Sequence, residues 1–183
     1  MFALIFGLSF LANAQDVQKD QPKGYQFTDI KRLPATSVKD QARAGTCWSW
    51  SGISFFESEM IRMGKEPIDL SAMYIVRHAY SDKATKFVRL HGSMNFAVGG
   101  AFCDVMHVIK NYGIVPMDVY MGLNYGEPNH AFGEIDDVLA GYINAVIKNS
   151  NKKLSTAWKK GFDGILDAYL GEEPEKFEYK GKE

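Results

Sequence analysis

Cys47 is the residue in this sequence best placed to act as a nucleophile. A helix is predicted from Cys47 to about Gly64, because apolar residues recur at helical spacing: Trp48, Ile53, Phe56, Met60 and Met63. Unpaired backbone N–H groups and the helix dipole favour a thiolate over a thiol at the first turn of a helix. A cysteine without such a position is most often a small buried hydrophobic residue. The position of Cys47 therefore predicts nucleophilic catalysis.

Gln41, six residues before Cys47, can complete such a site. The small residues Gly45 and Thr46 leave room for a substrate carbonyl to approach the sulfur. The side-chain amide of Gln41 can then donate a hydrogen bond to the developing oxyanion, together with the backbone N–H of Cys47. Cys47 and Gln41 are the predicted catalytic residues.

The second cysteine, Cys103, offers less chemistry. It lies four residues before His107 on one predicted helix face, a spacing that suits two metal ligands, but no third ligand is suitably spaced. We therefore predict no metal and no other cofactor. The two cysteines are 56 positions apart and form no C-x-x-C pair, which argues against thiol redox chemistry. A scaffold held by several disulfides is excluded, because at most one bridge can form.

Four more helices are predicted from apolar spacing and terminating glycines. They run from about 71 to 89, from the Gly99-Gly100 pair to a stop at Gly113, from about 134 to 149 and from about 154 to 170. Ile114 to Pro116 is predicted as a short extended piece. We expect a mostly helical chain.

The stretch Gln41-Ala-Arg-Ala-Gly-Thr-Cys47-Trp48 resembles the nucleophile motif of papain-like cysteine peptidases. Ala44 stands where many members have a bridging cysteine, and Thr46 replaces the usual Ser or Ala. A missing bridge is expected of the bleomycin hydrolase and aminopeptidase C branch.

The resemblance continues downstream and spans roughly residues 25–183. Leu70-Ser71 resembles the opening of the family's next helix. Gly99-Gly100 and the stretch Asn111 to Pro116 resemble its substrate-backbone loop and the continuation of that loop. The segment 130–170 is similar to the helical insertion of the bleomycin hydrolases.

The resemblance implies an α+β papain-like fold, represented here mainly by its helical N-terminal domain with insertion helices. It implies that Gly99 and Gly100 bind the substrate backbone, where a side chain would crowd the approach; alone, the pair would be interpreted as a turn. It also implies an aminopeptidase that acts on peptides through a thioester on Cys47. In the full-length protein it implies a homo-oligomer, a hexameric ring.

A catalytic histidine, oriented by an asparagine, must complete the mechanism. In this family both follow the cysteine by about 130–150 residues, near or beyond Glu183. His130, the last histidine, lies only 83 positions after Cys47. His130-Ala131 looks like the family's His-Ala strand, but helical spacing follows it; His78 and His91 have no recognisable partner. We therefore expect the β-rich half with His and Asn to be missing.

The first fourteen residues are almost wholly apolar and end in Ala12-Asn13-Ala14, which predicts a secretory signal peptide over 1–14 and export to the periplasm or the extracellular space. No Lys or Arg precedes the apolar run, so a buried first strand or helix is the alternative. The predicted organisation continues with an N-terminal arm over 15–38 and the papain-like half over 39–183. With a net charge of −1, no nucleic acid or membrane partner is predicted after signal cleavage.

Two functional hypotheses follow. The first is a cysteine aminopeptidase with Cys47 as nucleophile. The alternative is a catalytically incomplete fragment that only binds peptide or a partner subunit. A coding sequence that continued past Glu183 into a His-Ala strand would favour the first.

Overall fold

The computed structural model describes Gly24, Tyr25 and residues 27–180. The predicted signal peptide of residues 1–14 lies outside the described residues. The chain divides into two units, Met1–Arg32 and Leu33–Glu183, each considered by itself. In the first unit the described residues form irregular chain, with the rings of Tyr25 and Phe27 in contact. The second unit carries the helices and also includes residues 33–38, the last part of the predicted arm.

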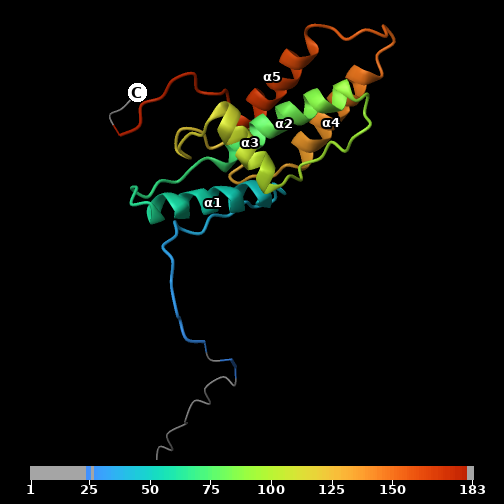
Figure 1. Ribbon diagram of the computed structural model, residues 1–183. Coiled ribbons are helices and arrows are strands. Elements are labelled where there is room, and N and C mark those ends of the chain that lie inside the picture. The colour runs from blue at the N-terminus through green and yellow to red at the C-terminus, as the bar shows by residue number, and fades with distance from the viewer. Residues whose placement is uncertain (1–23, 26, 181–183) are drawn as a thin grey trace, which may run out of the picture. The chain divides into compact units, whose positions relative to one another are not determined.

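The second unit contains five helices, which lie close to the predicted ranges (Figure 1). Ser71 caps the second helix by accepting a hydrogen bond from the Tyr74 amide at 3.0 Å. Glycines with positive φ end the third and fifth helices, as the sequence predicts. The helices are α1 (Cys47–Arg62), α2 (Ala72–Arg89), α3 (Phe102–Tyr112), α4 (Gly133–Ile147) and α5 (Trp158–Leu170).

Helix α2 is the centre of the unit. It packs against all four other helices, while α1 also packs on α3 and α4 on α5. Figure 1 shows α2 between α1 on one side and the α4–α5 pair on the other. Every residue from Ala72 to Tyr80 is buried, because neighbours cover all faces of this half of the helix. The buried half of α2 thus belongs to the core against which α1 packs.

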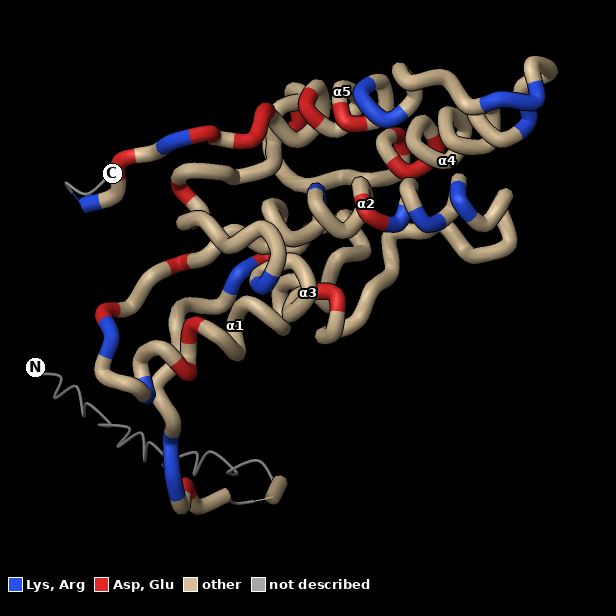
Figure 2. Tube along the Cα trace, turned by 45° about the horizontal axis from the view of Figure 1, so that its top comes forward, with Lys and Arg blue, Asp and Glu red and all other residues tan. Residues whose placement is uncertain are grey.

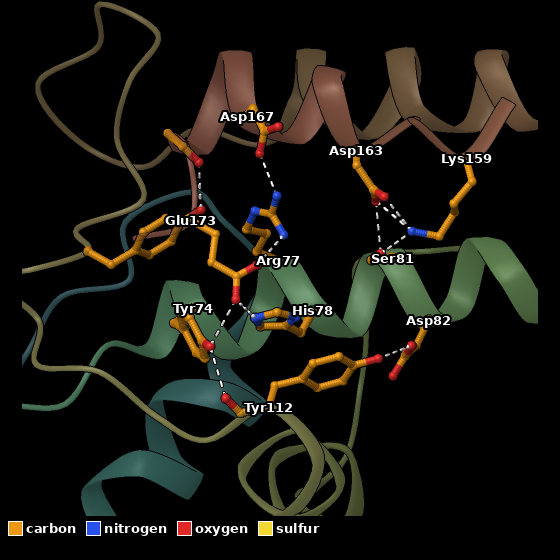
Figure 3. A network of polar contacts seen from close by, with 12 residues as sticks. Tyr74, Arg77, His78, Ser81, Asp82, Tyr112, Lys159, Asp163, Asp167 and Glu173 are labelled. Atoms are coloured by element: carbon orange, nitrogen blue, oxygen red, sulfur yellow. Dashed lines mark hydrogen bonds and ion pairs between the residues drawn. The ribbon is translucent and has the colours of Figure 1, made fainter. Parts of the chain in front are cut away.

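Two polar residues, Arg77 and His78, lie within this buried stretch of α2. Asp167 of α5 pairs with the Arg77 guanidinium at 2.5 Å, and Glu173 lies 3.4 Å from Arg77 and 3.2 Å from His78 (Figure 3). The Tyr74 hydroxyl donates to the same Glu173 carboxylate at 3.1 Å. Buried charges are tolerated when they are paired in this way. The ion pairs and the hydrogen bond of Glu173 therefore hold the segment after α5 against α2.

Isolated bridges join distant parts of the chain. Leu70 and Pro116 form an antiparallel bridge, which places the predicted extended piece beside the start of α2. Arg43 and Ala131 form a parallel one. No helix in the described part of the chain is long and apolar enough to cross a membrane.

Candidate active site

A tight turn delivers Cys47 to the first position of α1. Ala42 and Gly45 both have positive φ, at 50° and 65°. A Cβ on Gly45 would lie 3.1 Å from a methyl carbon of Val98, so a side chain there would be both strained and crowded. Thr46 precedes the helix, and its hydroxyl accepts a hydrogen bond from the Trp50 indole at 3.1 Å. The turn and the first helical turn are thereby fastened together.

The start of α1 is favourable for a nucleophile. Cys47 is exposed, and the first turn carries no acidic residue. From Cys47 to Phe56 the helix has no charged side chain, and Figure 2 shows this part of the tube in tan. The partial positive charge of the helix N-terminus is therefore not offset by an acidic residue of α1 near the thiol.

Cys47 and Gln41 line the same cavity, of about 410 Å³. Residues 35–39 form one wall, and Trp50, Ser51 and Ser54 of α1 form another. The side-chain oxygen of Gln41 is buried and has no hydrogen-bond partner among the described residues. The two predicted catalytic residues thus meet in a space where a substrate carbonyl can reach the sulfur.

Gly99 and Gly100 lie beside Trp48, the residue after the nucleophile. A Cβ on Gly100 would lie 2.5 Å from the Trp48 ring, so the glycine backbone rests directly on the indole. The Trp48 indole N–H donates to the carbonyl of Val98 at 3.0 Å. The two glycines are not among the residues that line the cavity of Cys47. The structure therefore places the predicted substrate-binding pair next to Trp48 and outside the lining of the Cys47 cavity.

The wall formed by residues 35–39 is fixed by a buried carboxylate that sequence reasoning missed. Glu57 of α1 is 1% exposed and accepts hydrogen bonds from the Thr36 hydroxyl, from the Lys39 ammonium at 2.8 Å and from the Leu70 amide at 2.7 Å. Lys39 also pairs with Asp69 at 2.7 Å. The available signal was a charged residue next to Phe56 on a helix face that is otherwise apolar. Glu57 thus ties the wall to the nucleophile's own helix.

None of the chain's four histidines, all in the described part, lines the cavity of Cys47. His130 lies on a segment that contacts the residues around Cys47: its carbonyl accepts the Arg43 amide at 2.9 Å, and its ring lies 5.9 Å from that of Trp50. Its Nδ1 is buried without a partner among the described residues, and burial lowers the pKa of the imidazole. The helix predicted after His130 is present as α4, which begins at Gly133. Sequence reasoning missed that the His130 segment pairs with the turn before Cys47.

The remaining histidines lie elsewhere. His78 is buried against Glu173, and His91 follows the end of α2. His107 is half exposed and lies 3.0 Å from a carboxylate oxygen of Asp82. The described residues contain no group of three or more His, Cys, Asp or Glu side chains that could hold a metal ion. His107 is thus engaged by Asp82, and Cys103 is a free, exposed thiol.

The comparison with known families agrees with this geometry. A family model described as papain family cysteine protease matches residues 22–157, which include Gln41, Cys47 and the Gly99-Gly100 pair. No curated protein sequence matches the chain. The five helices are consistent with the helical portion of the papain-like fold, which confirms the predicted fold class. Assignment to the bleomycin hydrolase branch stays a prediction. The chain belongs to the papain family of cysteine proteases.

Proposed function

We propose that the protein is a cysteine aminopeptidase of the bleomycin hydrolase and aminopeptidase C type, with Cys47 as its nucleophile. The observation that supports a peptidase site is the shared cavity of Cys47 and Gln41 at the N-terminus of α1. The narrower assignment is supported by Ala44 in place of a bridging cysteine and by the resemblance of segment 130–170 to the insertion helices of that branch.

In the proposed reaction the Cys47 thiolate attacks the carbonyl carbon of the scissile peptide bond. The Gln41 amide and the Cys47 backbone N–H donate to the oxyanion that develops. The C–N bond then breaks, the amine leaves with a proton, and water hydrolyses the remaining thioester. Gly99 and Gly100 hold the substrate backbone beside the sulfur.

The proton that the amine requires must come from an acid–base group near the sulfur. None of the four histidines lines the cavity, so we propose that a histidine and an asparagine from outside residues 24–180 complete the site. A partner subunit or a further stretch of the parent protein could supply them. The same observation favours a second candidate, a chain that binds peptide or a partner subunit without turnover.

Labelling with a peptidyl epoxide, followed by mass mapping of the modified residue, tests the proposed site. Cys103 is also free and exposed, so it serves as an internal reference in the same molecule. We expect saturable labelling at Cys47 and slower, non-saturable labelling at Cys103. Equal, non-saturable labelling of both cysteines would contradict the proposed peptidase site.

The role of Gln41 can be separated from general reactivity of the thiol. Acylation of Cys47 by a peptidyl p-nitrophenyl ester passes through an oxyanion, whereas alkylation by iodoacetamide does not. Because nitrophenolate leaves with its electron pair, no catalytic acid is needed to form the thioester. We expect Gln41→Ala to slow acylation by about 10²- to 10³-fold, the usual effect of removing one oxyanion donor, and to leave alkylation nearly unchanged. Equal effects on both rates would contradict the oxyanion role.

Turnover separates the two candidates. Hydrolysis of an aminoacyl amide substrate by the isolated chain, lost in Cys47→Ala, would support the enzyme and contradict the binding-only alternative. Saturable labelling without turnover would support a site that needs residues from elsewhere.

We also propose that the protein is exported and that the parent protein assembles into a homo-oligomeric ring. The apolar run that ends at Ala14 supports export, and the family resemblance supports the ring. A secreted form that begins at Gln15 is the expected result of N-terminal sequencing. A form that retains residues 1–14 in the cytoplasm would contradict export.

A further inference from the structure

Lys83 of α2 reaches the loop that carries Gly99 and Gly100. Its ammonium donates a hydrogen bond to the carbonyl of Gly99 and a longer one, at 3.4 Å, to the carbonyl of Ala97. The carbonyl between these two, that of Val98, accepts the indole N–H of Trp48 at 3.0 Å. Three successive carbonyls of the loop are therefore held by two side chains.

The two side chains also support each other. The Lys83 ammonium lies 5.4 Å from the centre of the Trp48 ring, within the range of a cation–π contact. The same ring lies directly against the backbone of Gly100. Lys83, Trp48 and the loop thus form one unit, and Trp48 joins this unit to Cys47.

The N–H groups of Gly99 and Gly100 are available to bind a ligand. Both glycines are exposed, and neither N–H has a hydrogen-bond partner among the described residues. Because Lys83 fixes the peptide plane that follows Gly99, it also fixes the direction of the Gly100 N–H. Exposed N–H groups with a fixed direction are what a substrate backbone needs for binding in one register.

The contacts of the Lys83 ammonium are with the loop and with aromatic rings. Lys83 forms no ion pair with any described residue, and its side chain is partly buried. Burial lowers the pKa of the ammonium. Partial burial of a charge costs free energy, which an apolar side chain of similar length would avoid. The contacts that offset this cost are the two loop carbonyls and the rings of Trp48 and Tyr80, so the ammonium is committed to the loop and to the ring that the loop rests on.

We propose that Lys83 is a positioning residue that sets the Gly99-Gly100 loop to bind the backbone of a peptide substrate beside Cys47. The inference rests on the proposed function, in which this loop binds the substrate. It goes beyond that function because it assigns the register of the peptide to a side chain of α2.

Three variants of the full chain test the inference. Lys83→Met keeps the aliphatic length without the ammonium, and Lys83→Arg keeps a charged donor that can reach two carbonyls. Lys86→Met is the matched control, since Lys86 is exposed one turn further along α2. For each variant, KI and kinact are measured at Cys47 with the peptidyl epoxide, and the alkylation rate with iodoacetamide.

We expect Lys83→Met to raise KI about tenfold, the effect of losing one or two backbone hydrogen bonds to the peptide. The iodoacetamide rate at Cys47 and the melting temperature should stay at their wild-type values. Lys83→Arg should recover part of the affinity, and Lys86→Met should behave as the wild type. In NMR spectra, Lys83→Met should shift the amide signals of Gly99 and Gly100.

Several results would overturn the inference. One is a KI in Lys83→Met within twofold of that of the wild type. Another is a rise in KI accompanied by parallel decreases in the iodoacetamide rate and the melting temperature, because that pattern reports a purely structural role. Absence of saturable labelling in the wild type would instead contradict the proposed function. Unshifted amide signals of Gly99 and Gly100 would still overturn the role of Lys83 in that case.

Discussion

Neighbouring glycines offer a sharp test of how the substrate-binding loop and the nucleophile's segment are joined. A Cβ on Gly100 would lie 2.5, 2.6 and 2.9 Å from three atoms of the Trp48 ring. A Cβ on Gly99 would meet nothing within 4 Å. Gly100→Ala and Gly99→Ala therefore add the same methyl group at adjacent positions, with opposite packing consequences.

The magnitude follows from the contact distances. Carbon atoms normally pack at about 3.5–4.0 Å, so the Trp48 ring or the loop must retreat by roughly 1 Å in Gly100→Ala. The ring cannot retreat freely, because it is 8% exposed and its N–H is bound to Val98 at 3.0 Å. Overpacking of this kind costs about 1–3 kcal/mol. For a domain of this size that cost corresponds to a fall in Tm of roughly 3–9 °C.

The assay combines thermal unfolding with labelling of Cys47 by the peptidyl epoxide. Gly100→Ala should lower Tm and weaken labelling, because displacement of Trp48 disturbs the start of α1. Gly99→Ala should keep or slightly raise Tm, since alanine restricts the unfolded chain. It should still raise KI, because the new methyl group occupies the face that the peptide approaches. Equal Tm values for the two variants would refute the packing argument, and wild-type KI in Gly99→Ala would refute the substrate-binding role.

Two further predictions concern buried ionisable groups. Glu57→Ala removes the acceptor of the buried Leu70 amide and one partner of Lys39, which keeps Asp69, and should destabilise the chain by about 1–3 kcal/mol in denaturant unfolding. Glu57→Gln, which keeps an acceptor, should cost less, and equal losses would contradict the argument. Burial lowers the pKa of His78 and His130 from the ordinary value of 6.5, because the folded state favours the neutral imidazole. The stability that these two residues contribute is therefore complete above pH 6.5 and is lost as the pH falls through their folded-state pKa values. Tm should therefore decrease below pH 6.5, and less steeply in His130→Gln. Burial raises the pKa of Asp136, so this residue changes the stability with pH in the opposite sense. The quantity to compare is therefore the difference in Tm between the wild type and His130→Gln at each pH. Identical slopes of Tm against pH in the two proteins would contradict the prediction.

The helices could be predicted because their signals are local. Apolar residues at helical spacing and terminating glycines located all five elements to within a few residues, except that α5 begins at Trp158, four residues after the predicted start. The turn before Cys47 and the apolar pattern after it likewise predicted that Cys47 lies at the start of α1. In contrast, the fourteen-residue apolar run predicts export, and the net charge of −1 predicts no nucleic-acid or membrane partner. Contacts among the described residues test neither prediction.

The supports of the site could not be predicted, because they depend on contacts between distant segments. Lys83 looks in the sequence like any lysine on a solvated helix face, and only the path of the loop brings the carbonyls of Ala97 and Gly99 to its ammonium. Glu57 lies on the apolar face of α1, four residues after Ile53, but nothing in the sequence says that it meets Lys39 and the Leu70 amide there. In both places a charged side chain binds backbone groups, and helical periodicity does not identify those partners.

The first turn of α1 explains why two separate supports are needed. Successive residues of a helix differ in direction by about 100°, so Cys47 and Trp48 face different walls. Cys47 faces the wall of residues 35–39, held by Glu57, and Trp48 faces the loop held by Lys83. The described contacts of Glu57 and Lys83 share no partner. Changes at sites without shared partners usually add within about 0.3–0.5 kcal/mol.

A double-mutant cycle tests this independence. In the logarithm of kinact/KI at Cys47, the effect of Glu57→Gln combined with Lys83→Met should equal the sum of the two single effects, within a factor of about two. Glu57→Gln should act chiefly on kinact, because it loosens the wall beside the thiol and Gln41, whereas Lys83→Met should act on KI. A coupling larger than fivefold would mean that both walls move together, and Trp48 would then be the residue that transmits the change between them.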